Sequence, residues 1–270
     1  MRPIAALSSG FPTMGGTGQT AGCNDPLCLS TVFYPHRWPQ YIWLSPTEGA
    51  GQMNYAGGDK YEGTTRPTDF FGSSLDHLGS LSLAELPRES TLVAVVDLNR
   101  GFAKQGALYS PRTEELLPGA AAFVDRCIAG RYSILPYTDC HTADSPELAS
   151  YPPHCLMGTE EPLLAPELSR LEAMARPKNS TNAYLADPEL FQAPQVTHVV
   201  ILGCCTDICI YQLAVTLTAY YNQHNRKVEV IVPVNLVDTY DGPGHPADLC
   251  NLMALYSMRQ NGVTLVRTID

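Results

Sequence analysis

The chain has 270 residues, which is enough for one α/β domain with a sizeable core. Its formal net charge of −10 leaves no basic surface in bulk for a phosphate backbone, so the composition argues against a nucleic-acid partner and favours a small neutral or cationic ligand. The sequence has no leader-like start and no long uncharged apolar stretch, so we expect a cytoplasmic protein without a membrane segment.

Residues 1–88 differ in composition from the rest of the chain. Ten of the 21 glycines fall within residues 1–63, and hydrophobic periodicity is weak there. An aromatic segment at residues 33–44 contains both tryptophans and is too apolar for a pure linker. We interpret residues 1–88 as an N-terminal extension that either packs on the main domain or a neighbouring subunit through this segment, or is mostly irregular.

From residue 89 onward, short apolar runs alternate with stretches of helical periodicity, which predicts a domain over residues 89–270. The apolar runs lack the alternation of a half-exposed sheet, and this is typical of a mostly parallel sheet covered by helices on both faces. The expected elements, in chain order, are a strand at 91–98, a helix at 115–129, strands at 132–139 and 197–205, a helix at 207–223, a strand at 227–237, a helix at 247–260 and a strand at 262–269.

Polar residues stand where several of these strands end. Asp97 closes the first strand, Asp139 closes the second, and the segment 203–210 links a strand to its helix. Because ligands of such sheets bind at the carboxyl ends of the strands, we expect these groups to meet at one edge. Taken alone, an aspartate at a strand end is more often a cap or turn residue than a catalytic one.

The segment 203–210 reads GCCTDICI and holds three of the nine cysteines. The odd total and the absence of any CxxC pair favour reduced thiols and argue against a structural four-cysteine zinc site. Cys204 and Cys205 close an apolar run, as small buried hydrophobic residues do. Thr206 or Asp207 is expected to cap the next helix, which places Cys209 in its first turn, where the helix dipole favours a thiolate. Position alone leaves packing as an alternative role for Cys209.

Three ordered segments resemble the signature segments of the isochorismatase-like cysteine hydrolases. They are VVDLNRGF with Asp97, PKNSTNAY with Lys178 and GCCTDICI with Cys209. The resemblance runs from about residue 89 to the end of the sequence and excludes the N-terminal extension. It implies a mainly parallel, six-stranded sheet flanked by helices, in agreement with the pattern of apolar runs.

The resemblance also implies a role for each of these residues. Cys209 would be the nucleophile, Asp97 the general base and later the acid, and Lys178 the cation that holds the other two in place. A thiol with an ordinary pKa of ~8.5 is mostly protonated at neutral pH, so it needs such a base or cation. The backbone N–H groups of Cys205 and Cys209 would form the oxyanion hole, with a cis peptide bond joining Cys204 to Cys205.

A second group of polar residues lies between 139 and 155. Asp139 and His141 form a D-x-H pair, His154 offers another imidazole, and Glu147 offers another carboxylate. Two imidazoles with carboxylates suit a divalent metal ion, with zinc favoured and iron or manganese as alternatives. A solvated loop with a few polar residues is the competing interpretation of these four side chains.

The same loop narrows the resemblance to one subfamily. The D-x-H pair, the PPHC stretch and the pair Gly158–Thr159 resemble the metal-binding loop of nicotinamidases. The resemblance implies that the ion anchors the pyridine nitrogen of the substrate, and that Phe102, Tyr151 and Tyr184 line its ring. Ordinary aromatic packing is an alternative for each of the three.

The expected function is therefore a cysteine-dependent amidohydrolase, and a nicotinamidase in particular. A related hydrolase of a carbamoyl, ureido or substituted carboxamide compound and a non-catalytic binding protein on the same fold are the alternatives. The extension at 1–88 and the segment 224–248 depart from a minimal nicotinamidase, and the second could remodel the pocket entrance. His245 and Asp241 in that segment are interpreted as loop residues. By analogy with other α/β hydrolases, we expect a homo-oligomer that acts on a small-molecule amide.

Overall fold

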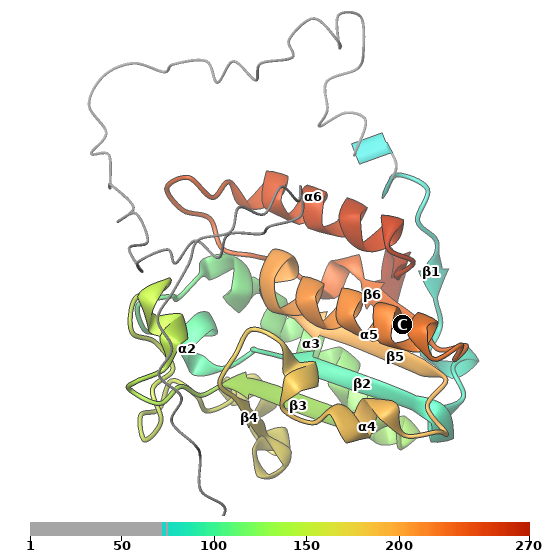
Figure 1. The fold of residues 1–270 in the computed structure, drawn as a ribbon, viewed down its shortest axis with the longest axis horizontal. Coiled ribbons are helices and arrows are strands. Elements are labelled where there is room, and N and C mark those ends of the chain that lie inside the picture. Colours follow the sequence, from blue (N-terminus) through green and yellow to red (C-terminus); the bar gives the residue numbers. More distant parts are fainter. Residues whose placement is uncertain (1–71, 74) are drawn as a thin grey trace, which may run out of the picture. The chain divides into compact units, whose positions relative to one another are not determined.

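The computed structural model describes residues 72–73 and 75–270 of the chain. Their central feature is a six-stranded, fully parallel sheet with the strand order β4-β3-β2-β5-β6-β7 (Figure 1). This confirms the parallel α/β sheet expected from the apolar runs. The strands are β2 (Thr91–Val96), β3 (Ser133–Asp139), β4 (Arg176–Lys178), β5 (His198–Gly203), β6 (Glu229–Pro233) and β7 (Thr264–Val266).

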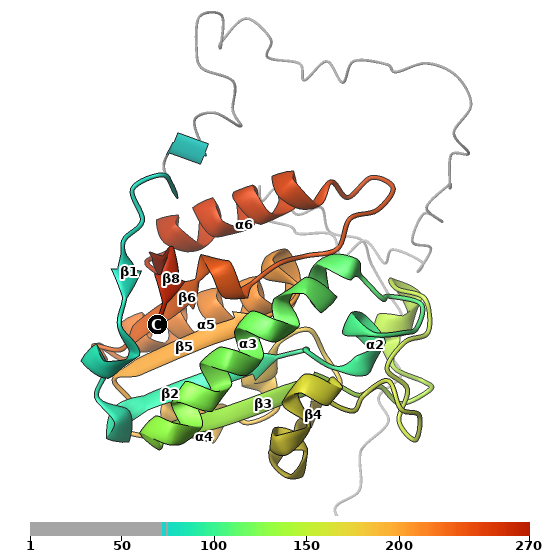
Figure 2. The same cartoon turned by 180° about the vertical axis from the view of Figure 1, so that it is seen from behind.

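Helices cover both faces of the sheet, as Figures 1 and 2 show from opposite sides. The central strand β2 explains why both faces are apolar. Val93 and Val95 pack against the face covered by α3, whereas Ala94 and Val96 pack against the face covered by α5 and α6. The α-helices are α2 (Arg100–Ala103), α3 (Pro111–Gly130), α4 (Pro188–Gln192), α5 (Tyr211–Gln223) and α6 (Ala247–Gln260). Among the described helices, none is long and apolar enough to cross a bilayer.

Three details differ from the elements expected from the sequence. The strand β4 has only three residues, one of them proline, so no apolar run marked it. The run at 262–269 divides into β7 and a short strand β8 (Thr268–Ile269), which pairs with β1 (Ser80–Leu81) in a separate two-stranded sheet. The helix expected at 207–223 is an α-helix only from Tyr211.

Residues just before the sheet also contribute to the core. Leu83 and Leu86 are buried in the same cluster as α3. The aromatic segment 33–44, with its two tryptophans, lies outside the described residues.

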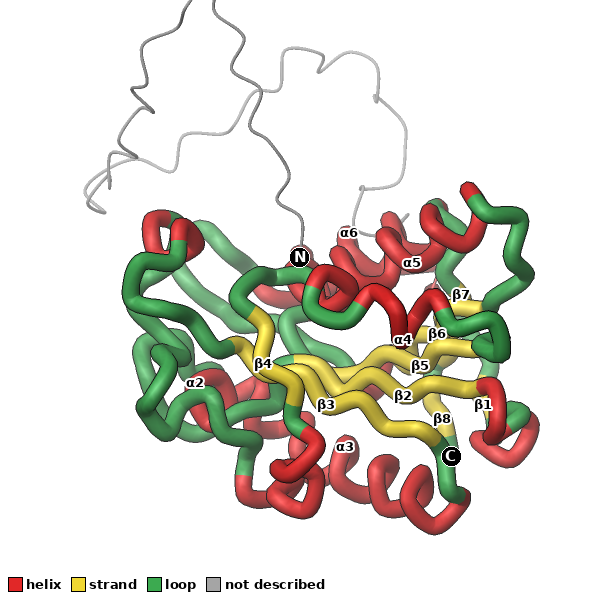
Figure 3. The backbone as a smooth tube through the Cα atoms, turned by 60° about the horizontal axis from the view of Figure 1, so that its bottom comes forward, coloured by secondary structure: helices red, strands yellow, loops and turns green. Residues whose placement is uncertain are grey.

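The loops that follow the strands gather with α2 at the carboxyl end of the sheet (Figure 3). At this end β2 and β5 approach closely at Gly203, which has a φ of +123°. A Cβ atom at this position would lie 1.9 Å from the carbonyl oxygen of Val96, so only glycine fits. The turn that follows Gly203 therefore begins directly beside the end of β2.

Candidate active site

Sheet pairing brings three chemically different side chains together. Asp97 follows β2, Lys178 ends β4, and Cys209 lies in the turn after β5. The Lys178 Nζ is 2.8 Å from Asp97 Oδ2 and 3.7 Å from Cys209 Sγ. All three side chains are almost completely buried. The carboxylate, ammonium and thiol predicted to meet at one edge of the sheet are thus adjacent.

Lys178 also contacts a second carboxylate. Asp139 and Lys178 are direct partners across β3 and β4, and the ammonium donates a short hydrogen bond to Asp139 Oδ1. It also donates a hydrogen bond to the carbonyl oxygen of Ser180, at 3.0 Å. One cation therefore lies between Asp97 and Asp139, and this keeps both carboxylates close together inside the protein.

Burial and charge shift the pKa values of these groups in different directions. Burial raises the pKa of Asp97 to about 7, although the nearby Lys178 charge acts in the opposite direction. Burial also raises the pKa of the Cys209 thiol, with Lys178 only partly offsetting it. Burial acts the same way on Asp139, but the Lys178 ammonium together with His141 and His154 outweighs it, and the pKa of that carboxyl lies below its usual range. Asp97 is thus a far better proton acceptor than an ordinary aspartate.

The turn that carries Cys209 has an unusual backbone. A cis peptide bond joins Cys204 to Cys205, as the family resemblance implies. Residues Thr206–Ile210 then form a π-helical turn that leads into α5. The Cys204 thiol donates to the carbonyl oxygen of Asp97 at 3.1 Å, which ties the turn to the end of β2.

The prediction that Thr206 or Asp207 caps the helix is wrong. Neither side chain forms a capping hydrogen bond at the start of this turn. The Asp207 carboxylate instead accepts hydrogen bonds from Thr239 and contacts His245, both of which lie in the loop before α6. The capping rule failed because a tertiary contact uses the carboxylate.

Asp97, Lys178 and Cys209 form a first cluster. A second cluster adjoins it through Asp139, which contacts Lys178. The side chains of Asp139, His141, Glu147 and His154 offer ligand atoms that lie within 4.8 Å of one another. The Asp139 Oδ2 is 3.4 Å from His141 Nε2 and 3.6 Å from His154 Nε2. Glu147 Oε1 is 3.9 Å from His141 Nε2. These are the four residues that the sequence proposed as metal ligands.

The histidines of this cluster are oriented as metal ligands are. Nδ1 of His141 is 3.0 Å from the side-chain oxygen of Asn179, and Nδ1 of His154 is 2.8 Å from the carbonyl oxygen of Pro152. An oxygen acceptor at Nδ1 fixes the proton there and leaves the lone pair on Nε2. Among the described residues, His141 Nε2 is buried without a hydrogen-bond partner. The four side chains therefore fit a divalent cation.

The aromatic residues proposed to line the substrate differ in their surroundings. The ring of Phe102 is 5.7 Å from the ring of His154, and the ring of Tyr151 is 6.0 Å from it. Both rings thus border the metal-ligand cluster. The ring of Tyr184 contacts Phe191 and Tyr220, and its hydroxyl accepts a hydrogen bond from Gln192. The described contacts of Tyr184 are thus those of aromatic packing.

Other residues support the site without having been singled out from the sequence. Asn179 orients His141, and its position directly after Lys178 could have indicated it. The Asn99 amide donates to the Cys155 thiol at 3.1 Å and to the carbonyl oxygen of Glu161 at 3.0 Å. The Glu161 carboxylate accepts from the Cys155 N–H at 2.7 Å. These bonds hold the loop that carries His154 against the end of β2.

Comparison with known proteins agrees with this geometry. Nicotinamidase 1 of Arabidopsis thaliana is 28% identical over 222 residues, which cover 68% of this chain and 89% of that protein. The pyrazinamidase/nicotinamidase structure of Streptococcus mutans UA159 superposes with a TM-score of 0.57 at 19% identity, over 66% of this chain and 100% of that one. The structure of a Pyrococcus horikoshii pyrazinamidase in complex with zinc gives a TM-score of 0.52 at 20% identity, over 66% and 98%.

At these identities the two solved structures establish the fold alone. The family follows from a different match, in which the isochorismatase domain model covers residues 91–270. That range is well over half of the chain and includes Asp97, Lys178 and Cys209. The chain therefore belongs to the isochorismatase family, as its three signature segments indicated.

Proposed function

We propose that the protein is a nicotinamidase, which converts nicotinamide and water to nicotinate and ammonia through a thioester on Cys209. The observation that carries this proposal is the position of Lys178, which links the cluster containing the thiol to the cluster of imidazoles and carboxylates. In nicotinamide, the amide carbon would react with the thiol in one cluster, and the ring nitrogen would bind at the other. Two adjacent clusters would therefore suit one small substrate that carries both groups. Whatever its substrate, the chain is a hydrolase that acts on amide C–N bonds.

Substrate binding is assigned to the second cluster and its aromatic neighbours. Asp139, His141, Glu147 and His154 would hold a divalent ion, for which the donor set favours zinc over iron or manganese. When bound, this ion supplies a Lewis-acidic partner for the pyridine nitrogen. Phe102 and Tyr151 border the same cluster and would stack on or flank the ring.

The chemical step is assigned to the first cluster. The Cys209 thiol passes its proton to the Asp97 carboxylate, and the sulfur attacks the carboxamide carbon. The negative charge that develops on the oxygen is accepted by the N–H groups of Cys205 and Cys209. Lys178 holds Asp97 in place and offsets negative charge at the thiolate.

Collapse of the tetrahedral adduct breaks the C–N bond and completes the first half of the reaction. The proton on Asp97 goes to the leaving nitrogen, which departs as ammonia and leaves a thioester. The Asp97 carboxylate then takes a proton from water, whose oxygen attacks the thioester carbon. Return of that proton to the sulfur releases nicotinate and restores Cys209. The raised pKa of Asp97 suits a group that both accepts and returns a proton near neutral pH.

Ammonia release from nicotinamide tests the proposal. We expect the purified chain to release ammonia, and Cys209→Ala to reduce the rate to background with an unchanged circular dichroism spectrum. The matched control is Cys127→Ala, which removes another buried cysteine on α3 and should retain activity. Turnover by Cys209→Ala at the wild-type rate would refute the thioester mechanism.

A panel of amides separates nicotinamidase activity from the alternatives. The panel contains nicotinamide, pyrazinamide, a ureido compound and a carbamoyl amino acid, compared by kcat/KM. We expect the highest value for nicotinamide and loss of activity on chelation. A preference for the ureido or carbamoyl compound, or full activity after complete metal removal, would reject the nicotinamidase assignment and keep the hydrolase.

A further inference from the structure

A second group of potential metal ligands includes a residue of the catalytic turn. Asp207 comes from the turn itself, His245 from the loop before α6, and Cys250 from the first turn of α6. Their ligand atoms all lie within 4.8 Å of one another, and each side chain is half-buried. Asp207 and Cys250 also line a surface cleft between the turn and α6, together with Tyr211, Met253, Ala254 and Ser257.

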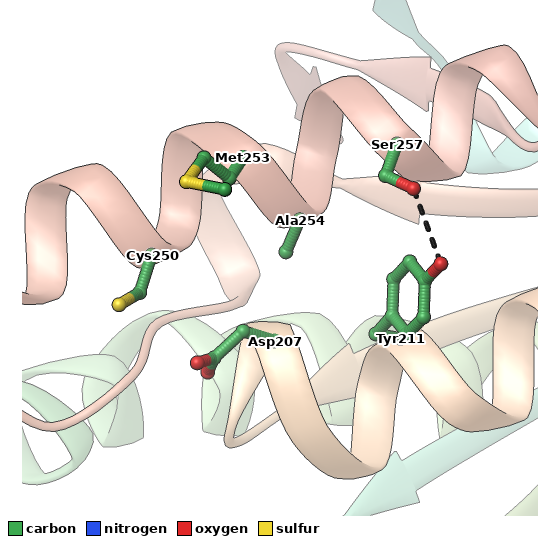
Figure 4. A pocket seen from close by; sticks show the side chains of 6 residues that line it. All are labelled: Asp207, Tyr211, Cys250, Met253, Ala254 and Ser257. Atoms are coloured by element: carbon green, nitrogen blue, oxygen red, sulfur yellow. Dashed lines mark hydrogen bonds between the residues drawn. The ribbon is translucent and has the colours of Figure 1, made fainter. Parts of the chain in front are cut away.

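Figure 4 shows how the two side chains lie in this cleft. The carboxylate of Asp207 and the thiol of Cys250 are at the same end, and both point away from the hydrogen bond that joins Tyr211 to Ser257 at 3.1 Å. A sulfur and an oxygen donor thus lie at the same end of the cleft.

His245 has an arrangement that a neutral imidazole does not satisfy. Its Nδ1 is 2.9 Å from the carbonyl oxygen of Tyr240, and its Nε2 is 2.7 Å from Asp207 Oδ2. Both partners are oxygen acceptors, but a neutral imidazole has only one N–H to donate. The ring satisfies both contacts when it carries a second proton, or when a cation takes the place of that proton between Nε2 and the carboxylate.

The metal-ligand cluster on Asp139 shows the same pattern. Both of its histidines have Nδ1 held by an oxygen and Nε2 directed at a carboxylate oxygen. His198 has a similar arrangement, with a hydroxyl oxygen at Nδ1 and Nε2 3.7 Å from Glu229, but among the described residues it belongs to no cluster of three potential ligands. The cluster of three ligand groups therefore distinguishes His245 from His198.

We propose that Asp207, His245 and Cys250 form a second divalent-metal site, of the zinc class. Thiolate, imidazole and carboxylate together are donors that zinc accepts, and water would complete a tetrahedral site as the fourth ligand. Zinc bonds of about 2.0–2.2 Å at a tetrahedral angle separate nitrogen and oxygen ligands by roughly 3.4 Å, so Nε2 and Oδ2 need to move apart by only about 0.7 Å.

One of the three ligands lies in the turn that carries Cys209. Asp207 is two residues before the thiol, and its other oxygen already accepts a hydrogen bond from Thr239 at 2.6 Å. An ion at this site would tie the catalytic turn to the loop 237–246 and to α6. The site would thereby stabilise the turn in its observed conformation, whatever substrate the enzyme takes.

Cobalt absorbance tests this proposal, because the cluster on Asp139 contains no sulfur ligand. The full chain, stripped of metal and titrated with Co²⁺, should bind about two equivalents and show a sulfur-to-cobalt charge-transfer band in the near ultraviolet. We expect Cys250→Ser to remove this band and one equivalent of metal. His141→Ala should remove the other equivalent and keep the band.

Matched controls identify variants that fail for other reasons. His198→Ala removes a comparable half-buried histidine beside an acid and should leave both equivalents and the band unchanged. His245→Gln provides a second route to losing the band if Cys250→Ser unfolds, and circular dichroism monitors both. Binding of one equivalent by the wild-type chain without a charge-transfer band, or a band that persists in Cys250→Ser, would overturn the proposal. Neither readout depends on amidase activity, so this result is separate from that of the nicotinamide assay.

Discussion

Replacing Lys178 by methionine tests whether one buried ammonium holds the site together. The substitution keeps a side chain of similar length but leaves Asp97 and Asp139 without their shared cation. At the 2.8 Å separation from Asp97, the gross Coulomb attraction is about 6 kcal/mol for an effective dielectric constant of about 20. Because the variant no longer has to desolvate an ammonium, we expect a net loss of about 3–5 kcal/mol in the free energy of unfolding.

Urea unfolding of the metal-stripped protein measures this loss without interference from a bound ion. In a thermal unfolding experiment on a domain of about 200 residues, the same loss corresponds to a fall of roughly 6–20 °C in the midpoint temperature. Adding Asp97→Asn to Lys178→Met should recover part of the stability, since it removes one of the two uncompensated carboxylates.

Lys104 provides a matched control because it also joins two carboxylates. It lies 2.9 Å from Glu114 and 2.8 Å from Glu167, but its side chain remains partly exposed to solvent. Exposed ion pairs contribute little, so Lys104→Met should scarcely change the unfolding free energy. If Lys178→Met were no more destabilising than Lys104→Met, the reasoning from burial and shared charge would be refuted.

Three further predictions address the proton acceptor, the metal cluster and the strand contact. Below about pH 7, kcat/KM should fall about tenfold per pH unit. Burial raises the pKa of Asp97 to about 7, and the protonated carboxyl does not accept the thiol proton. A flat pH profile of kcat/KM across this range would contradict the role of Asp97 as the base. Asn179→Ala should weaken zinc binding by about 10- to 100-fold by freeing the His141 ring, and equal affinities in a calorimetric titration would count against that role. Gly203→Ala should give no soluble folded protein, because its Cβ atom would meet a carbonyl oxygen of β2. Gly158 also has a positive φ, of +85°, but a Cβ atom there would lie in open space, so Gly158→Ala should fold; equal soluble yields would exclude the steric explanation.

Much of the fold could be predicted because apolar runs report burial on both faces of a sheet. Residues 91–96 are nearly all buried, and such a run has few alternatives to a central parallel strand. The same logic gives no signal for β4, where Arg176, Pro177 and Lys178 contain no apolar run and pair with β3 at the sheet edge. Only the resemblance to a family with six strands predicted that strand.

The site was predictable where its residues stand in recognisable segments. Asp97, Lys178 and Cys209 each occur in such a segment, and their meeting follows from parallel strands ending at one edge. Asn179 and His245 were not predicted in their observed contacts, because each meets its partner across 38 residues of sequence. Such contacts depend on how two loops pack, and residue spacing carries no information about that.

The double contact of Lys178 has a consequence for inhibition. The same ammonium contacts both Asp97 and Asp139. A species bound at the cluster that contains Asp139 would draw negative charge away from that carboxylate. The strength of the contact between the ammonium and Asp97 would then change. A covalent inhibitor aimed at Cys209 would then react at a rate set partly by a group that it never touches. Screens for such compounds would rank the same molecules differently on preparations that differ only in what occupies the neighbouring cluster.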